Sequence, residues 1–101
     1  MGLAEEIVAL LSEKKYKLTT AESCTGGMIA SELVNVAGIS EFYEEGYITY
    51  ANHAKSKLLG VDEEVLKTKG AVSKEVAYMM AEGAAKAAGA DVSVAVTGIA
   101  G

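Results

Sequence analysis

Ser23 is the side chain in this sequence best placed to act as a nucleophile. It lies in the segment Glu22-Ser23-Cys24-Thr25-Gly26-Gly27, where a short β-favouring stretch gives way to a helix. A helix start supplies main-chain N–H donors without partners inside the helix, and glycines let a ligand approach the backbone closely. A hydroxyl there could attack a carbonyl carbon while neighbouring N–H groups hold the oxyanion. The alternative is that Ser23 or Thr25 only caps the helix.

A serine nucleophile needs a base, and the sequence offers two candidates. His53 is the single imidazole, but a lone histidine near a helix start is usually a surface residue. Lys55 is the better candidate, because a desolvated ammonium loses its proton readily and can then accept one from a hydroxyl. Tyr50 could relay or orient that proton. The alternatives are a solvated helix lysine and an ordinary sheet tyrosine.

Other kinds of catalytic chemistry find less support. Cys24 is the only cysteine; it could be a thiol nucleophile, but a small buried residue is the better interpretation. A Ser-x-x-Lys pattern at 12–15 lies on the polar face of a helix with no glycine turn beside it, and we interpret it as a chance match. No Asp, His or Cys residues have the spacing of metal ligands. We therefore expect no catalytic metal and no cofactor.

The charge balance excludes some partners. The 101 residues include 14 acidic and nine basic side chains, for a net charge of −5, and the basic residues are scattered. Nucleic-acid binding requires clustered Lys and Arg, so we expect no nucleic-acid partner. A small anion is compatible, because helix-start N–H groups can hold it. With no leader-like start and no apolar run near the ~20 residues of a membrane span, we expect a cytoplasmic protein without a membrane partner.

Hydrophobic periodicity divides the chain into alternating helices and strands. Asn52, Asp62 and Ser73 are expected to cap helices, and glycines mark several helix ends. The expected helices are 3–15, 25–38, 52–60, 62–70 and 73–89, and the expected strands are 17–21, 42–50 and 92–96, the last of them buried. Strands separated by helices predict an α/β fold with a parallel or mixed sheet covered on both faces.

Polar clusters follow all three expected strands. Ser23 follows the first, residues 50–55 follow the second, and residues 97–101 follow the third. In open α/β sheets, ligands bind at the carboxyl ends of the strands. We therefore expect these clusters to converge on one site.

Five short motifs carry a resemblance to a known family. They are Ala-Glu-Ser-Cys-Thr-Gly-Gly at 21–27, Gly-Tyr-Ile-Thr-Tyr-Ala-Asn-His-Ala-Lys at 46–55, Leu-Leu-Gly-Val at 58–61, Gly-Ala-Val-Ser at 70–73 and Val-Thr-Gly-Ile-Ala-Gly at 96–101. In this order and spacing the chain resembles the C-terminal domain of CinA, the competence/damage-inducible family. The resemblance implies one domain over residues 1–101, with a three-layer α/β/α fold and a mixed, mostly parallel sheet.

The resemblance also implies an activity. The family's domain is a nicotinamide-nucleotide amidase, which converts nicotinamide mononucleotide to nicotinate mononucleotide and ammonia. The catalytic residues so implied are Ser23 as nucleophile, Lys55 as base and Tyr50 in an assisting role. The substrate-binding residues expected around them are Glu22, Thr25, Gly26, Gly27, Asn52, Thr97 and Gly98. The expected partner is thus a small nucleotide substrate.

The sequence also departs from the family pattern. Family members continue past the motif at 96–101 into further strands, a last helix and an arginine that resembles a substrate-binding group. We therefore expect this chain to lack the C-terminal part of the domain, to form an incomplete sheet of about three strands, and to associate as a homo-oligomer through the exposed edge. Two further hypotheses stay open: a non-catalytic module that binds a nucleotide or forms oligomers, and a serine hydrolase of a different amide or ester.

Overall fold

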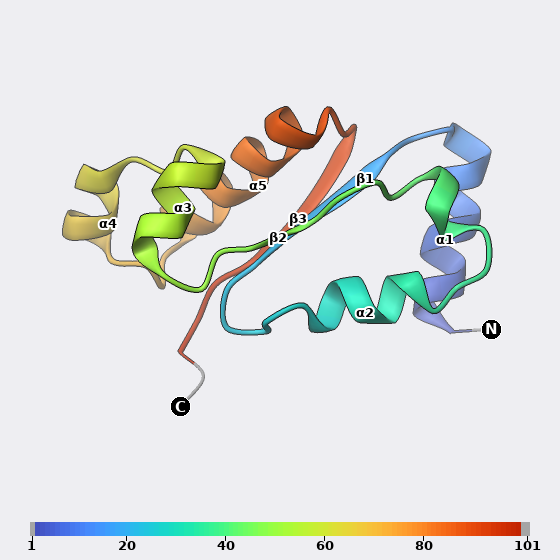
Figure 1. The fold of residues 1–101 in the computed structure, drawn as a ribbon, viewed down its shortest axis with the longest axis horizontal. Coiled ribbons are helices and arrows are strands. Elements are labelled where there is room, and N and C mark those ends of the chain that lie inside the picture. Colours follow the sequence, from blue (N-terminus) through green and yellow to red (C-terminus); the bar gives the residue numbers. More distant parts are fainter. Residues whose placement is uncertain (1, 100–101) are drawn as a thin grey trace.

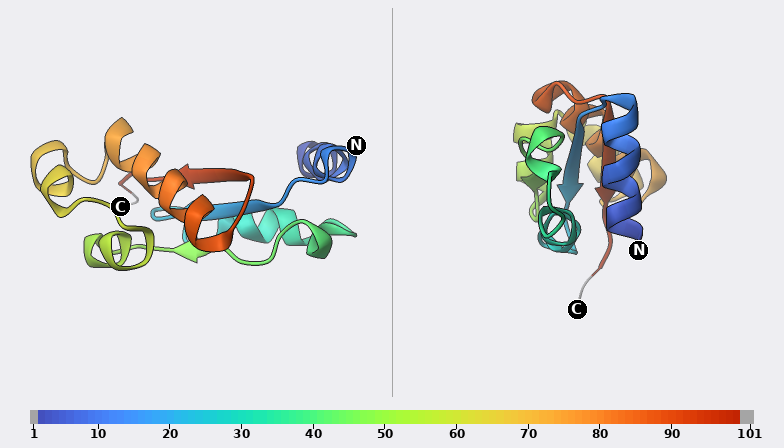
Figure 2. Two further views of the ribbon diagram at one scale, coloured as in Figure 1. Left: turned by 90° about the horizontal axis from the view of Figure 1, so that it is seen from above. Right: turned by 90° about the vertical axis from the view of Figure 1, so that its right-hand side faces the viewer.

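The computed structural model describes residues 2–99 as five α-helices, one short 3₁₀ helix and three strands. In chain order the elements are α1 (Leu3–Lys14), β1 (Leu18–Glu22), α2 (Met28–Val34), η1 (Ile39–Glu41), β2 (Tyr47–Ile48), α3 (Asn52–Leu59), α4 (Glu63–Lys69), α5 (Lys74–Ala88) and β3 (Val92–Val96). The molecule measures 40 × 28 × 18 Å, with α3 and α4 at one end and α1 at the other (Figure 2). None of these helices has the length and apolar character needed to cross a bilayer.

The three strands form one sheet in the order β2-β1-β3 (Figure 1). The central strand β1 pairs with β3 along its whole length and with β2 over two residues, and both pairings are parallel. Every residue of β1 is buried. The structure confirms the expected α/β fold with about three strands. Within residues 2–99 the sheet is wholly parallel rather than mixed.

Helices cover the sheet from both sides. Helices α3, α4 and α5 lie on one side, and α1 and α2 lie on the other (Figure 1). Two hydrophobic clusters fill the two interfaces: Ala21, Leu59, Val61, Leu66, Val76, Met80 and Ala84 beneath α3–α5, and Val8, Leu11, Leu18, Leu33 and Ile39 beneath α1 and α2. The three-layer α/β/α architecture is therefore confirmed. Successive side chains of a strand point to opposite faces of the sheet. Two consecutive residues at the end of β1 therefore face different helix layers.

The second helix begins later than the sequence predicts. It was expected from Thr25, but α2 starts at Met28. Gly26 and Gly27 have φ of +58° and +107°, which is left-handed backbone that interrupts a right-handed helix. The turn that carries Ser23 is therefore longer than expected.

The predicted strand over 42–50 is also wrong for most of its length, because only Tyr47–Ile48 pairs as a strand. The main-chain N–H groups of Phe42 and Tyr43 donate back to the Ile39 carbonyl and so close η1. Those donors are therefore not available to a sheet.

The predicted helix caps are partly confirmed. Asp62 and Ser73 accept hydrogen bonds from Glu64 N and Val76 N, as N-caps do. Asn52 is not a cap: it is the first helical residue of α3, and Ala51 precedes it without a side-chain cap.

Strand β3 is exposed on one face, contrary to the expectation of a buried strand. Val92 and Val94 are 37% and 40% exposed. On the other face, the Ser93 hydroxyl donates to the Ala81 carbonyl of α5 at 2.7 Å, so α5 covers that side. β3 is exposed because it is an edge strand, and no helix in residues 2–99 covers its second face.

Candidate active site

Ser23 lies at the carboxyl end of the central strand. Its N–H donates to the Val96 carbonyl at 3.0 Å, which joins the ends of β1 and β3. The residue is 5% exposed. Because Ala21 packs into the cluster beneath α3–α5, alternation along the strand turns Ser23 toward the same layer.

The preceding carboxylate, Glu22, faces the opposite layer. One oxygen, Oε1, accepts from the Thr25 hydroxyl at 2.7 Å and from the N–H groups of Gly27 and Ile29 at 3.2 and 3.0 Å. The other oxygen, Oε2, accepts from Ala30 N at 3.0 Å. A carboxylate is favoured at a helix start, where N–H groups lack partners. Glu22 therefore fixes the turn that follows the nucleophile candidate.

These bonds also determine the ionisation of Glu22. Burial by itself raises the pKa of a carboxyl group, because it disfavours the charged form. Here the hydrogen bonds from Thr25, Ala30, Ile29 and Gly27 outweigh burial, so the pKa of Glu22 lies below its ordinary value. The group is thus a carboxylate whose hydrogen-bonding capacity is directed into the fold.

Lys55 extends from α3 to Ser23. Its Nζ donates to Ser23 Oγ at 3.1 Å and to the Tyr50 carbonyl at 3.2 Å. The residue is 1% exposed, and no carboxylate oxygen in residues 2–99 lies within 4.0 Å of this ammonium. Burial therefore lowers the pKa of Lys55, and the neighbouring Cys24 side chain opposes that effect in part. A buried amine without a counterion, bonded to a hydroxyl, has the properties of a general base.

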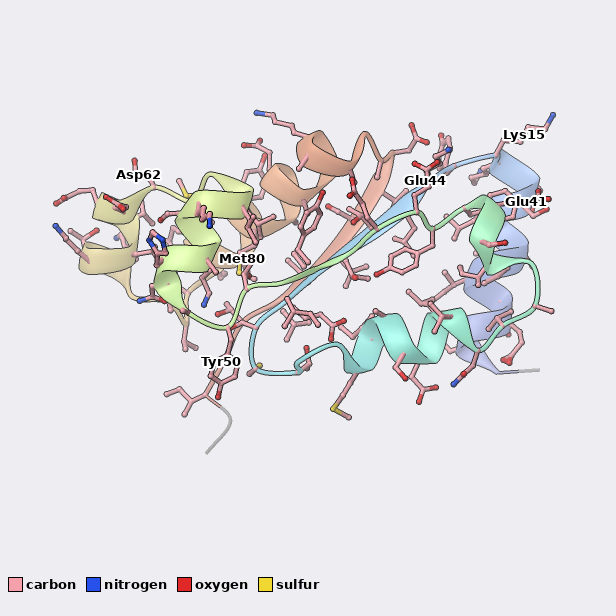
Figure 3. The ribbon with its side chains drawn as sticks, in the orientation of Figure 1. Lys15, Glu41, Glu44, Tyr50, Asp62 and Met80 are labelled. Atoms are coloured by element: carbon pink, nitrogen blue, oxygen red, sulfur yellow. The ribbon has the colours of Figure 1, made fainter. Side chains whose placement is uncertain are left out.

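Tyr50 contributes its carbonyl to this arrangement and not its ring. The carbonyl accepts from Lys55, as above, while the side chain is 69% exposed. In Figure 3 the ring projects outward beyond the sheet. Tyr50 thus forms part of the rim, and its hydroxyl makes no hydrogen bond to Ser23 or Lys55.

A hollow of about 320 Å³ opens beside the Ser23–Lys55 pair. It is lined by Ser23, Cys24, Tyr50, Asn52, Lys55, Ala71, Thr97, Gly98 and Ile99. The Thr97 hydroxyl donates to the Ala71 carbonyl at 2.8 Å and so ties the end of β3 to the loop before α5. All three strand ends contribute to the hollow.

The structure brings together six of the ten residues proposed for the site from the sequence: Ser23, Tyr50, Asn52, Lys55, Thr97 and Gly98. The other four, Glu22, Thr25, Gly26 and Gly27, do not line this hollow. Glu22 and Thr25 bond to each other on the far side of β1, and the two glycines form the turn into α2.

Three further lining residues, Cys24, Ala71 and Ile99, were not among the ten proposed. Cys24 was interpreted as a small buried residue, but it is half-buried and lines the hollow. Ala71 and Ile99 fall within motifs of the family resemblance, at 70–73 and 96–101, but neither has a functional group that would single it out. Proximity to a motif was therefore the only available signal.

The weaker candidates lie elsewhere. His53 is exposed and lines a separate hollow of about 440 Å³ between α3 and α4, which shares only Asn52 with the Ser23 hollow. Ser12 and Lys15 line another surface hollow with Phe42. Within residues 2–99 no group of His, Cys, Asp or Glu side chains is arranged to hold a metal ion.

Comparison with known proteins identifies the family. The model of the CinA C-terminal domain matches residues 1–101. This chain belongs to the CinA C-terminal domain family. A CinA-like protein from Kosmotoga olearia is 54% identical over 100 residues, which are 99% of this chain and 24% of that protein. The chain thus spans about a quarter of the length of such relatives.

Solved structures of the family have the same fold. A competence-damaged protein (CinA) superfamily protein from Escherichia coli superposes with a TM-score of 0.96 at 43% identity, over 98% of this chain and 58% of that one. A competence/damage inducible protein from Agrobacterium tumefaciens gives a TM-score of 0.91 at 46% identity, over 98% and 60%. The parallel sheet and its helices are therefore those of the CinA family.

Proposed function

We propose that this CinA-family chain carries the catalytic site of an amidohydrolase that converts nicotinamide mononucleotide to nicotinate mononucleotide and ammonia. One observation carries the catalytic part of the proposal: Ser23 Oγ lies 3.1 Å from the Nζ of a lysine that is 1% exposed. The resemblance to nicotinamide-nucleotide amidases supplies the substrate.

The reaction begins with proton transfer from the Ser23 hydroxyl to a neutral Lys55. Ser23 Oγ forms a bond to the carboxamide carbon, and the carbonyl oxygen takes the negative charge. As the tetrahedral intermediate collapses, the carbon–nitrogen bond breaks and Lys55 returns its proton to the departing ammonia. A water molecule then loses a proton to Lys55, attacks the acyl-enzyme ester and releases the acid and Ser23.

The donors for the oxyanion are best sought directly after Ser23. The N–H groups of Gly27, Ile29 and Ala30 already donate to Glu22. The N–H groups of Cys24 and Thr25 donate to no acceptor within residues 2–99. Two adjacent main-chain donors next to the nucleophile are a common form of oxyanion hole.

The rim of the hollow suits a planar ring. The Tyr50 side chain is 69% exposed and that of Ile99 is 85% exposed, both at the mouth. Aromatic and apolar surfaces of this kind pack well against a heteroaromatic ring. These side chains support a nicotinamide-like substrate over an aliphatic amide.

Ammonia release from nicotinamide mononucleotide tests the proposal in the full-length protein. We expect Ser23→Ala and Lys55→Met to lower kcat by about 10³-fold or more, because each removes a group that acts in every turnover. Methionine fills the volume of the buried lysine without its charge, so the variant should fold. Lys57→Ala, at an exposed position of α3, is the control and should retain the rate.

Turnover that survives in both Ser23→Ala and Lys55→Met would refute the mechanism. Binding of the nucleotide without release of ammonia by the unaltered protein would favour the non-catalytic hypothesis instead. Hydrolysis of other amides or esters in preference to this nucleotide would keep the mechanism and change the substrate.

A further inference from the structure

A fully buried hydroxyl lies beside the candidate site without a hydrogen bond. Thr49 is 0% exposed, and its Oγ1 has no partner in residues 2–99, a property it shares only with Ser56 Oγ. Buried polar groups are nearly always hydrogen-bonded, and an exception calls for an explanation such as a catalytic role. The position of Thr49 suggests one.

Thr49 lies next to both residues that bond to Lys55: it precedes Tyr50 in the chain, and its main chain pairs beside Ser23. Its own N–H donates to the Glu22 carbonyl at 2.8 Å, which places it across from the end of β1 where Ser23 follows. The next residue is Tyr50, whose carbonyl accepts from Lys55 Nζ. Tyr47, two residues earlier, packs against the cluster beneath α3–α5. Because extended side chains alternate, Thr49 faces the same layer as Ser23 and Lys55.

The hydrogen bonds of Lys55 are one short. A neutral amine has one lone pair and two N–H donors. In the neutral amine, the lone pair accepts a hydrogen bond from the Ser23 hydroxyl and the Tyr50 carbonyl accepts one N–H. The second N–H then has no acceptor among the bonds present. The protonated amine has three donors and the same two acceptors. Lys55 thus lacks one acceptor, and Thr49 Oγ1 lacks one partner.

We propose that Thr49 is a positioning residue: its hydroxyl, which bonds to no group within residues 2–99 of this structure, turns to accept the remaining N–H of Lys55 when the amine is neutral, so that the lone pair is held toward Ser23 Oγ. Without this acceptor the amine can rotate about its Cε–Nζ bond, and the lone pair points to Ser23 for only part of the time. This inference rests on the proposed function, since it assumes that Lys55 is the base. It extends that proposal to a residue that does not contact the substrate.

Thr49→Val and Thr49→Ser test the inference. Valine keeps the shape of threonine and removes the hydroxyl, whereas serine keeps the hydroxyl. We expect Thr49→Val to lower kcat for the amide about 10-fold to 100-fold with KM nearly unchanged, because orientation of the base is lost and binding is not. Thr49→Ser should recover most of the rate. The melting temperature of both variants is measured alongside, because a loss of kcat without loss of folding separates orientation of the base from a general structural effect.

Ser56→Ala is the matched control. It removes the other buried hydroxyl without a partner, one residue from Lys55 but in the separate hollow between α3 and α4. Its kcat should equal that of the unaltered protein. A serine-directed fluorophosphonate gives a second readout that does not depend on the substrate: Ser23 Oγ bonds to phosphorus, fluoride leaves, and Lys55 takes the proton.

The outcomes separate the two proposals. If the unaltered protein is labelled at Ser23 and Thr49→Val is labelled equally fast, the inference is wrong and the Ser23–Lys55 mechanism stands. If labelling slows in Thr49→Val and recovers in Thr49→Ser, the inference holds even where the nicotinamide substrate proves incorrect. If the unaltered protein is neither labelled nor active, the proposed function fails, and the role of Thr49 fails with it.

Discussion

At the scale of single residues, the candidate site depends on a lysine that the fold keeps away from acids. Glu22 is adjacent to Ser23 in sequence, yet its carboxylate bonds to Thr25 and α2 on the other side of β1. A carboxylate beside Lys55 would stabilise the ammonium and raise its pKa. Its displacement to the opposite layer leaves burial as the main influence on Lys55.

This arrangement predicts how activity depends on pH. Lys55 must be neutral to accept a proton, and its pKa is lowered from the ordinary 10.5. We therefore expect kcat/KM to rise with pH through one ionisation whose midpoint lies below 10.5. Lys55→Arg should abolish both the rise and most of the activity, because a guanidinium stays charged. Cys24→Ser should keep the rise, which excludes the neighbouring thiol as its source. A flat profile in the unaltered protein would contradict a lysine base.

The lowered pKa of Glu22 makes a prediction about stability. The folded state favours the carboxylate, so its contribution to stability is present above the ordinary pKa of 4.5 and is lost as pH falls through the lower folded-state value. We expect Glu22→Gln to lower the free energy of unfolding by about 1–3 kcal/mol at neutral pH. The difference between variant and unaltered protein should shrink in acid. Urea denaturation at several pH values measures it, and a difference that grows in acid would be inconsistent with this assignment.

At the scale of elements, the approach of α3 to α5 sets the position of Lys55. Gly83 of α5 lies against α3 so closely that a Cβ there would be 1.8 Å from the Leu59 carbonyl oxygen. That distance is far inside van der Waals contact with backbone, which has little freedom to move. Only glycine lets the two helices pack at this separation, and α3 carries Lys55 to Ser23.

Gly83→Ala should therefore be destabilising. In an exposed helix interior, alanine in place of glycine stabilises by roughly 0.5–1 kcal/mol. Here we expect a loss of about 2–4 kcal/mol, because α3 must move away from α5. Activity should fall as well, since the movement separates Lys55 from Ser23. Thermal denaturation measures the first effect, and a raised melting temperature would show that the contact with Leu59 is not tight.

Element types could be predicted from the sequence better than their boundaries. The helices around Lys55 and Met80 and the strand at Val92–Val96 follow from hydrophobic spacing and glycine stops. The start of α2 and the length of β2 do not, because each is decided by the turn conformation and the hydrogen-bond partners that the segment adopts, which residue types alone do not specify. Glu22 bonds to α2 from the end of β1, and the N–H of Tyr43 donates to Ile39 rather than to a strand. Local propensity contains no information about such partners.

At the scale of the whole molecule, the site lies where the three strand ends meet. The topology of a parallel sheet predicts this convergence, and so Ser23, Lys55 and Thr97 could be proposed together from the sequence. Whether Glu22 binds the substrate could not be decided from the sequence. Strand alternation turns Glu22 and Ser23 to opposite faces of the sheet, but the sequence does not say which helices cover which face. The expectation of a homo-oligomer remains a prediction; light scattering would measure it, and the exposed face of β3 is where contact would be sought.

The central claim is that Ser23 forms a covalent acyl-enzyme with the help of Lys55. Hydroxylamine tests it most directly, because it intercepts an acyl ester far faster than an amide. We predict that the full-length protein, turning over nicotinamide mononucleotide in hydroxylamine, yields the hydroxamate alongside the acid, detected by mass spectrometry, and that Ser23→Ala yields neither. Steady formation of the acid with no hydroxamate would mean that water attacks the amide directly, and would contradict the account.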